Sequence, residues 1–401
     1  MNKSLLPKIR FKGFNGEWVL KQIKALGNIK IGKTPSTKNE KNWLNDVLWI
    51  TIPDMTKKYL TNSKKKISLM ASKKNPVVKE KSILFSCIGT IGNIGITTTI
   101  TSFNQQINSI SSIKDVVEYV YYLFQYNTEK IKSYSLTQTL PMINKNYFEN
   151  IEIFVSLNYK EQNKIADFFT IIDKKIELVK EQLTLLAKQK QYYLNNMFTN
   201  EKSYPQIRFR GFINENNFQK VKLRTIATIW GGSTPSTKNK KLWLNEIPFI
   251  TPNFITKNNS MLLNKYDRFI TDKNFNFSNK NDILLTCRAP VGVVTINNLE
   301  KCWFSQGIKN IRTGKLINHK YLYYWLYNNK NVLITNSFGT TFLEISNKDL
   351  ENIQIYITCS LQEQTKIAHF FSIIDRKIEL VKEQLSLLVK QKQYYLNNMF
   401  I

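Results

Sequence analysis

The sequence predicts an α+β protein in which two duplicated α/β-type domains are separated by a long antiparallel coiled coil of two helices. Three observations lead to this fold class. The chain repeats itself once, each copy ends in a long segment with heptad spacing, and the remainder of each copy alternates short β-type runs with turns. With 401 residues, 42% of them hydrophobic, the chain is long enough for packed cores in two or three domains.

The internal repeat is clearest at the end of each copy. Residues 168–198 recur as residues 370–400, with 27 of 31 positions identical. Weaker matches extend the repeat, including PKIRFKGF with PQIRFRGF and GKTPSTKN with GSTPSTKN. Two copies therefore fill the chain as one tandem duplication. We expect a first domain at 1–157, a helix at 158–198, a linker at 199–204, a second domain at 205–359 and a helix at 360–401.

The part of each copy that precedes the helix resembles a domain of short strands with long loops. Runs such as WITIPDM and FITPNF are rich in β-branched and aromatic residues and are bounded by turn residues. Short helices are predicted at 119–126 and 321–328. The stretch 82–113 contains no charged residue, yet glycines and amides interrupt it. We interpret it as a buried strand pair with glycine turns rather than as a membrane segment.

The end of each copy carries a heptad seam, in which apolar residues recur at alternating steps of three and four. The central seam residues are Ile172, Ile176, Val179, Leu183 and Leu186 in the first copy, and Ile374, Ile378, Val381, Leu385 and Leu388 in the second. Lys190 and Lys392 occupy one seam position each. A parallel pair in register would place these lysines side by side, so we expect antiparallel pairing. The alternative is that each helix packs on another protein.

The excess of positive charge belongs to the two domains. The chain has 58 Lys and Arg against 29 Asp and Glu, a formal charge of +29. Residues 1–157 carry +13 and residues 201–359 carry +12, whereas each helix region carries only +2. A single basic cluster can be merely a solvated face. Two equally basic domains favour a polyanionic partner, with nucleic acid ahead of an acidic membrane.

The candidate DNA contacts lie in two equivalent TPSTKN loops and in one lysine-rich stretch. Hydroxyl, amide and ammonium groups can reach phosphate oxygens or base edges, and residues 57–81 hold nine lysines and one acid. The tryptophans that follow the loops, Trp43 and Trp243, are interpreted as core anchors. Arg288 is a candidate guanine contact, with a structural salt bridge as the alternative. The candidates are Lys33, Thr34, Ser36, Thr37, Lys38, Asn39, Lys57, Lys58, Lys64, Lys65, Lys66, Lys73, Lys74, Ser233, Thr234, Ser236, Thr237, Lys238, Asn239 and Arg288.

Catalytic and cofactor signals are weak. The chain has two histidines, and its four cysteines lack the spacing of metal ligands. Residues 27–34 match the pattern GxxxxGK[ST], but Pro35 follows where a helix should begin and the second copy breaks the pattern. No long apolar run marks a signal peptide at the start. We therefore expect a cytoplasmic, non-catalytic protein without a metal or cofactor of its own.

The duplicated domains, the near-identical helices, the GxTPS loops and the PxIRFxGF openings together resemble the specificity (S) subunit of Type I restriction-modification systems. The resemblance implies that each domain is a target recognition domain for one half of a bipartite, asymmetric DNA sequence. It further implies that the helices set the spacing and dock two methyltransferase subunits, which use S-adenosylmethionine. Nuclease/translocase subunits would bring ATP and Mg²⁺. The alternative is a stand-alone architectural or regulatory DNA-binding protein.

Overall fold

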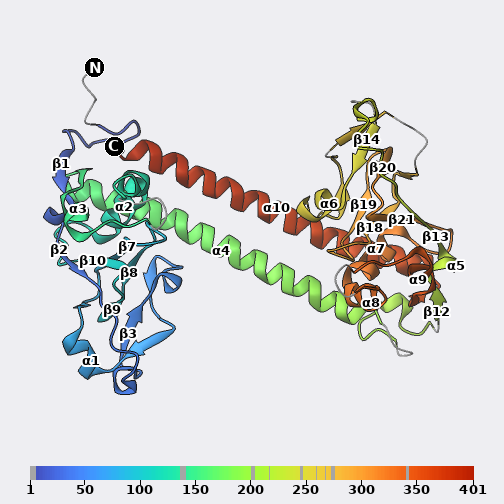
Figure 1. The fold of residues 1–401 in the computed structure, drawn as a ribbon, viewed down its shortest axis with the longest axis horizontal. Helices are drawn as coiled ribbons and strands as arrows, with labels where there is room; N and C mark the ends of the chain where they lie inside the picture. The colour runs from blue at the N-terminus through green and yellow to red at the C-terminus, as the bar shows by residue number, and fades with distance from the viewer. Residues whose placement is uncertain are drawn as a thin grey trace. The chain divides into compact units, whose positions relative to one another are not determined.

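The computed structural model describes residues 6–135, 141–199, 204–215, 217–243, 247–258, 260–266, 268–271, 276–339 and 343–401. Most of the predicted linker at 199–204 lies outside the described residues. The chain forms two compact units, Met1–Lys180 with Gln384–Ile401 (unit 1) and Glu181–Glu383 (unit 2). Each unit therefore combines one globular domain with parts of both long helices (Figure 1).

Unit 1 contains three sheets, with strand orders β1-β11, β2-β10-β7-β8-β4 and β5-β3-β9-β6. Its strands are β1 (Val19–Gln22), β2 (Asn28–Ile31), β3 (Val47–Ile50), β4 (Tyr59–Leu60), β5 (Lys65–Ile67), β6 (Val77–Val78), β7 (Ile83–Ser86), β8 (Ile94–Thr97), β9 (Thr101–Phe103), β10 (Ile107–Ser111) and β11 (Glu152–Val155). Its helices are α1 (Leu69–Lys74), α2 (Val117–Lys132), α3 (Lys145–Asn150) and the first part of α4 (Tyr159–Met197).

Unit 2 repeats this topology, with strand orders β12-β22, β13-β21-β18-β19-β15 and β16-β14-β20-β17. Its strands are β12 (Phe218–Lys222), β13 (Ala227–Gly231), β14 (Ile247–Ile250), β15 (Leu262–Leu263), β16 (Arg268–Ile270), β17 (Phe277–Asn279), β18 (Ile283–Thr286), β19 (Val294–Asn297), β20 (Lys301–Phe304), β21 (Ile308–Thr313) and β22 (Gln354–Thr358). Its helices are α5 (Leu223–Ile226), α6 (Pro252–Asn258), α7 (His319–Asn328), α8 (Lys330–Thr335), α9 (Asn347–Asn352) and the first part of α10 (Leu361–Met399). The duplication predicted from sequence is thus confirmed strand by strand.

The uncharged stretch at 82–113 is the buried centre of the first domain. It contains the predicted strand pair, β7 and β8, which the structure shows to be antiparallel, and it also contributes β9 and β10. Residues such as Leu84, Phe103 and Ile107 pack in the core between the five-stranded and four-stranded sheets. The segment is therefore four strands rather than two. Within the described residues, no helix is long and apolar enough to cross a membrane.

The two short predicted helices are present and longer than expected. The first is α2, which covers the five-stranded sheet of unit 1, and the second is α7 in unit 2. Most of their aromatic residues are buried, whereas Tyr126 is half-buried and Tyr327 is exposed. Because Tyr119 and Tyr321 lie in the same core clusters as the ends of the long helices, α2 and α7 join each domain to the helix pair.

The long helices α4 and α10 each begin at a side-chain cap. Asn158 Oδ1 accepts hydrogen bonds from the backbone N–H of Lys160 (3.0 Å) and Glu161 (3.2 Å), and Ser360 Oγ accepts one from Glu363 N–H (3.3 Å). Such oxygens satisfy amides that have no partner within the helix. Both helices then run for 39 residues, with the predicted seam residues buried or half-buried along one face.

The pairing of α4 with α10 is antiparallel in each unit. In unit 1, Lys392 Nζ lies 2.7 Å from Asp173 Oδ1, and in unit 2, Lys190 Nζ lies 2.6 Å from Asp375 Oδ1. Each seam lysine near the end of one helix thus meets an aspartate near the start of the other. The antiparallel pairing predicted from the positions of the two lysines is confirmed within each unit. The fold class is two duplicated α+β domains with an antiparallel coiled coil of two helices.

Candidate nucleic-acid interface

The TPSTKN loops at 34–39 and 234–239 have the same local construction. Gly32 and Gly232 precede them, and a Cβ atom at either position would overlap two backbone carbonyl oxygens of the neighbouring strand segment. The prolines, Pro35 and Pro235, are buried. Glycine therefore lets the chain cross the sheet closely, and proline anchors the loop that follows.

Several hydrogen bonds fix the backbone of each loop and leave the next side chains exposed, although Asn39 Oδ1 and Asn239 Oδ1 accept hydrogen bonds from the backbone N–H of Lys41 (3.2 Å) and Lys241 (3.1 Å). In the first loop, Trp43 Nε1 donates to the Ser36 carbonyl (3.2 Å), and in the second, Trp243 Nε1 donates to the Ser236 carbonyl (3.1 Å). Thr34 and Thr234 are half-buried and bond to Gln105 and Gln306. The exposed side chains are Ser36, Thr37, Lys38, Asn39, Ser236, Thr237, Lys238 and Asn239.

The two tryptophans act as the predicted core anchors. Trp43 packs edge-on against Trp49, with ring centroids 5.0 Å apart, and Trp243 packs in the same way against Phe249, 5.4 Å apart. Both are partly buried on the outer face of the four-stranded sheet of their unit. Since the same indoles bond to the serine carbonyls, they fix the loops to the sheet.

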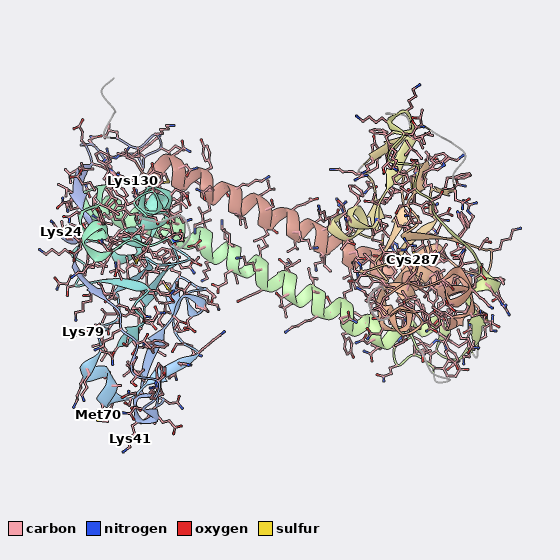
Figure 2. The ribbon with its side chains drawn as sticks, in the orientation of Figure 1. Lys24, Lys41, Met70, Lys79, Lys130 and Cys287 are labelled. Atoms are coloured by element: carbon pink, nitrogen blue, oxygen red, sulfur yellow. The ribbon has the colours of Figure 1, made fainter. Side chains whose placement is uncertain are left out.

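Several lysines of unit 1 lie at the end of the domain that carries α1 and the short 3₁₀ helix Glu40–Asn42: Lys73 and Lys74 belong to α1, and Figure 2 labels Lys41 there, whereas Lys24 and Lys130 lie away from this end. Most of the candidates are exposed, whereas Lys66 is half-buried in β5. Lys65 Nζ lies 5.2 Å from the centre of the Trp43 ring, and Lys57 forms an exposed ion pair with Glu177 on α4 (3.7 Å). The exposed candidates are Lys33, Lys38, Lys57, Lys64, Lys65, Lys73 and Lys74.

Lys58 does not belong to this exposed surface. Its Nζ donates hydrogen bonds to Thr170 Oγ1 on α4 (2.8 Å) and to Tyr122 Oη on α2 (3.1 Å). Burial lowers the pKa of Lys58 from 10.5 to about 8, against the attraction of Glu118 and Asp173. The structure thus corrects the sequence-based placement of Lys58: this side chain joins the first domain to the helices.

The second unit has methionine in place of this lysine. The Lys58 carbonyl accepts a hydrogen bond from Ile96 N–H, and the Met261 carbonyl accepts one from Ile296 N–H, both at 2.7 Å, so the two positions are equivalent. Tyr324 Oη bonds to Asp375 (2.9 Å) as Tyr122 bonds to Asp173 (2.8 Å). The first domain is therefore joined to the helices by a titratable lysine, and the second domain has methionine at that position.

Replacing Lys58 by methionine is expected to change how stability depends on pH. Below the lowered pKa of Lys58, about 8, the ammonium is charged in both states. Between pH 8 and the unfolded-state pKa of 10.5, the folded chain has released the Lys58 proton, whereas the unfolded chain retains it. Lys58 therefore makes the wild-type free energy of unfolding increase with pH in this range. Urea titrations from pH 7 to 10.5 should show that Lys58→Met lacks this component and that exposed Lys57→Met keeps it. Identical pH profiles for wild type and Lys58→Met would contradict the assignment.

Arg288 forms the structural salt bridge that the sequence left open as an alternative. Its Nε donates to Glu344 Oε2 (3.0 Å), and the two residues also form an isolated β-bridge. The side chain of Arg288 is half exposed. A guanine contact from Arg288 stays a prediction, and it would have to use the guanidinium nitrogens that face away from Glu344.

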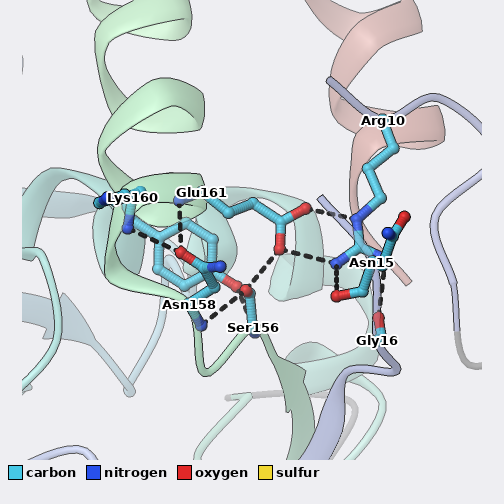
Figure 3. A network of polar contacts seen from close by, with 8 residues as sticks. Arg10, Asn15, Gly16, Ser156, Asn158, Lys160 and Glu161 are labelled. Atoms are coloured by element: carbon cyan, nitrogen blue, oxygen red, sulfur yellow. Dashed lines mark hydrogen bonds and ion pairs between the residues drawn. The ribbon is translucent and has the colours of Figure 1, made fainter. Parts of the chain in front are cut away.

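The two PxIRFxGF openings attach each domain to both long helices; Figure 3 shows the polar contacts of Arg10 with Glu161 in unit 1. In unit 1, Arg10 binds Glu161 at the start of α4 through two bonds of 2.6 and 3.0 Å, and the Glu161 side chain is fully buried. Ile9 N–H donates to the Asn398 carbonyl near the end of α10 (2.8 Å). Ser156 Oγ also donates to Glu161 (2.6 Å). We call this arrangement the helix-end clamp.

Unit 2 contains the same helix-end clamp with the helices exchanged. Arg208 binds buried Glu363 at the start of α10 through two bonds of 2.9 Å. Ile207 N–H donates to the Asn196 carbonyl near the end of α4 (2.9 Å). Each opening thus binds the start of one helix and the end of the other, a role that the sequence motif by itself did not reveal.

Removing the arginine of one clamp is expected to destabilise its unit strongly. Arg10→Met leaves the buried Glu161 carboxylate without its cation, and breaking a buried pair in this way costs about 3–5 kcal/mol. The urea midpoint of the variant should fall accordingly. Adding Glu161→Gln removes the unpaired charge and should restore most of the loss. A midpoint unchanged by Arg10→Met would show that the clamp contributes no stability.

The outer faces of the long helices carry an apolar stripe that sequence reasoning missed. The stripe residues are Ile171, Leu178, Leu185 and Tyr192 on α4, and Ile373, Leu380, Leu387 and Tyr394 on α10. They recur every seven residues, one position before alternate seam residues. All are about half exposed or more, with Leu185 at 65% and Leu387 at 67%. The sequence contains this stripe as a second set of apolar residues at heptad spacing, outside the seam.

The described residues contain no group of three or more His, Cys, Asp or Glu side chains that could hold a metal ion. Burial raises the pKa of Cys87 and Cys302 to about 12, so neither is a reactive thiolate at neutral pH. The candidate interface therefore offers hydrogen-bonding groups and positive charges on exposed loops.

Fold and surface together define the class of protein: two copies of one α+β domain, each presenting the same exposed polar loop, on paired antiparallel helices. Residues 15–188 and 215–391 match the family model of the Type I restriction modification DNA specificity domain. These matches cover most of the chain, and the protein therefore belongs to this family of Type I restriction-modification specificity subunits.

Individual relatives agree with this family. The chain is 36% identical over 188 residues to the Type I restriction enzyme MjaIX specificity subunit of Methanocaldococcus jannaschii. This alignment covers 45% of this chain and 43% of that protein. The chain is 34% identical over 84 residues to the HindI specificity subunit of Haemophilus influenzae, or 20% of this chain and 18% of that one. The alignments thus span less than half of these relatives. The fold resembles that of a crystal structure of a Type I restriction-modification S subunit from M. genitalium, with a TM-score of 0.62, 16% identity and 99% of each chain covered.

Proposed function

We propose that this chain is the non-catalytic DNA-recognition subunit of a Type I restriction-modification complex and that it reads a bipartite, asymmetric target. The observation that carries the proposal is the duplication of the specificity domain, with one equivalently built basic loop in each copy. Two similar but unequal domains would read two different half-sites. The domains differ at positions such as Arg288, which replaces Ile88.

Recognition in this proposal has two components. Exposed lysines such as Lys38 and Lys238 neutralise phosphates, which supplies affinity with little sequence information. Hydroxyl and amide groups of the same loops, such as Thr37 and Asn39, can bond to base edges in a groove, which supplies specificity. The two helices run through both units and would set the number of base pairs between the half-sites.

The apolar stripe supports docking of partner subunits onto the helices. Apolar residues that stay exposed at heptad spacing are typical of a helix face that binds another helix. Because the stripes on α4 and α10 occupy equivalent positions, they suit two copies of one partner. We propose two methyltransferase subunits, which would supply S-adenosylmethionine. Two nuclease/translocase subunits would add ATP and Mg²⁺, and the assembly would act on DNA in the cytoplasm.

Methylome sequencing of a host with and without the gene, expressed beside its candidate methyltransferase gene, tests this proposal. The expected result is methylated adenine in one split motif, present only when both genes are present. Co-purification should recover a complex with two methyltransferase subunits. If the chain instead binds specific DNA tightly and stays monodisperse without any partner, and no methylation depends on it, it is a stand-alone architectural or regulatory protein.

A further inference from the structure

Three large apolar side chains are exposed together at the basic end of unit 1. Leu44 is 54%, Leu69 is 63% and Met70 is 55% exposed. Two hydrogen bonds hold their segments together: Ser68 N–H donates to the Asn42 carbonyl (2.9 Å), and Leu69 N–H donates to Asp46 Oδ2 (2.9 Å). We call these three residues the apolar tip; Figure 2 labels Met70 and the nearby Lys41.

The apolar tip is held rigidly and does not belong to the core. Ser68 Oγ caps α1 by accepting a hydrogen bond from Ala71 N–H (3.1 Å). Ala71 is 3% exposed and packs against the outer face of the four-stranded sheet, with Val47 and Trp49. The buried side of α1 is thereby fixed, and Leu69 and Met70 are left projecting into solvent at a cost in hydration free energy.

The charges around the apolar tip favour nucleic acid as its partner. Lys73 and Lys74 lie one turn further along α1, on the faces of Leu69 and Met70, and Lys41 and Lys65 come from the adjacent segments. The acids of the same segments are Asp46, which accepts a hydrogen bond from the Leu69 amide, and Glu40 in the 3₁₀ helix, so the lysines outnumber them. Lysine is depleted in protein–protein interfaces. In DNA-bending proteins, by contrast, leucine and methionine wedges occur among cations that bind the flanking phosphates.

We propose that Leu69 and Met70, supported by Leu44, form a wedge that the first domain presses against a base step of its half-site. The wedge partly unstacks that step, while Lys73, Lys74 and Lys65 hold the phosphates on either side. This inference rests on the proposed function. It assigns the first domain a component of specificity that needs no hydrogen bond to a base, because easily unstacked steps cost less to deform.

The test uses the full-length chain in complex with its methyltransferase subunits and a duplex that carries the target found by methylome sequencing. 2-Aminopurine replaces, one at a time, the adenines of the half-site read by the first domain, apart from the methylated adenine. The wild-type chain should raise the fluorescence of one probe several-fold, because unstacking relieves quenching. Leu69→Ala with Met70→Ala should lose this rise and bind the target more weakly by roughly 10- to 100-fold.

Two control variants separate the wedge from other effects. Leu20→Ala removes a leucine that is 47% exposed in β1, at the opposite end of unit 1 from α1 (Figure 1), and should leave both readouts unchanged. Lys73→Ala should weaken binding and lower the salt dependence by about one phosphate contact, with the fluorescence rise retained.

The outcomes distinguish the wedge from the proposed function. A wild-type complex that does not discriminate its target from a scrambled duplex would refute DNA recognition itself. Discrimination without any fluorescence rise, or a rise that persists in the Leu69→Ala, Met70→Ala variant, would refute only the wedge. If that variant no longer co-purifies with its methyltransferase subunits, the apolar tip is a protein-docking surface and the wedge is wrong.

Discussion

Aspartate in place of both Leu185 and Leu387 is expected to abolish methylation while the chain itself stays folded. These residues lie at the centres of the two exposed stripes, so the substitutions leave the seam untouched. In the proposed complex, each would place a charge in a desolvated helix interface. Such a change costs about 3 kcal/mol or more, roughly a hundredfold in affinity per site. Co-purification of the methyltransferase subunits and methylome sequencing measure the effect.

The same helices offer a matched control. Ala187 and Val389 are also exposed apolar residues, and each lies two positions beyond a stripe leucine. Two positions turn an α-helix by about 200°, so these side chains point away from the stripe. Ala187→Asp with Val389→Asp should leave the complex and its methylation intact. Equal loss in both double variants would show that charge anywhere on the helices is harmful and that the stripe is not the docking face.

Duplicating one heptad in both helices is expected to move methylation to a motif with a longer spacer. Copies of residues 179–185 in α4 and 381–387 in α10 preserve the seam pattern, because seven residues restore the same register. They lengthen each helix by about 10 Å, close to three base pairs of DNA at about 3.4 Å per pair. Methylome sequencing should find both original half-sequences separated by about three more base pairs, and little methylation at the original motif.

The control is the same insertion in one helix only. It displaces one set of seam residues against the other and separates Lys190 from Asp375 or Lys392 from Asp173. We expect a lower urea midpoint and loss of methylation without a new motif. An unchanged spacer in the chain with both insertions would contradict the role of the helices in setting the spacing.

The architecture was predictable from sequence because it depends on periodic, local signals. A heptad seam over nearly forty residues specifies a helix that needs a partner, and the near-identity of residues 168–198 with 370–400 points to that partner. The direction of pairing also followed from two lysines, Lys190 and Lys392. The ion pair between each lysine and an aspartate on the opposite helix could not be predicted, because Asp173 and Asp375 look like ordinary surface charges in the sequence.

The site was less predictable because side-chain direction depends on contacts distant in sequence. Lys58 and Lys57 are neighbours in the same basic run, yet Lys58 turns inward to reach Thr170. Arg10 lies in the PxIRFxGF motif, and the sequence gives this arginine no partner. Its partner, the buried Glu161, lies 151 residues later in the chain. The loop residues at 36–39 and 236–239, by contrast, follow from local turn chemistry and are exposed, while their contact with DNA stays a prediction.

The central claim is that each domain reads its own half of the target, and exchanging one domain tests it most directly. Residues 205–357 would be replaced by the corresponding segment of another specificity subunit, with α4, α10 and the first domain retained. Methylome sequencing should then show one half-sequence replaced and the other half-sequence and the spacing unchanged. If both half-sequences change, or if the motif stays the same, the two domains do not read DNA independently and the account is wrong.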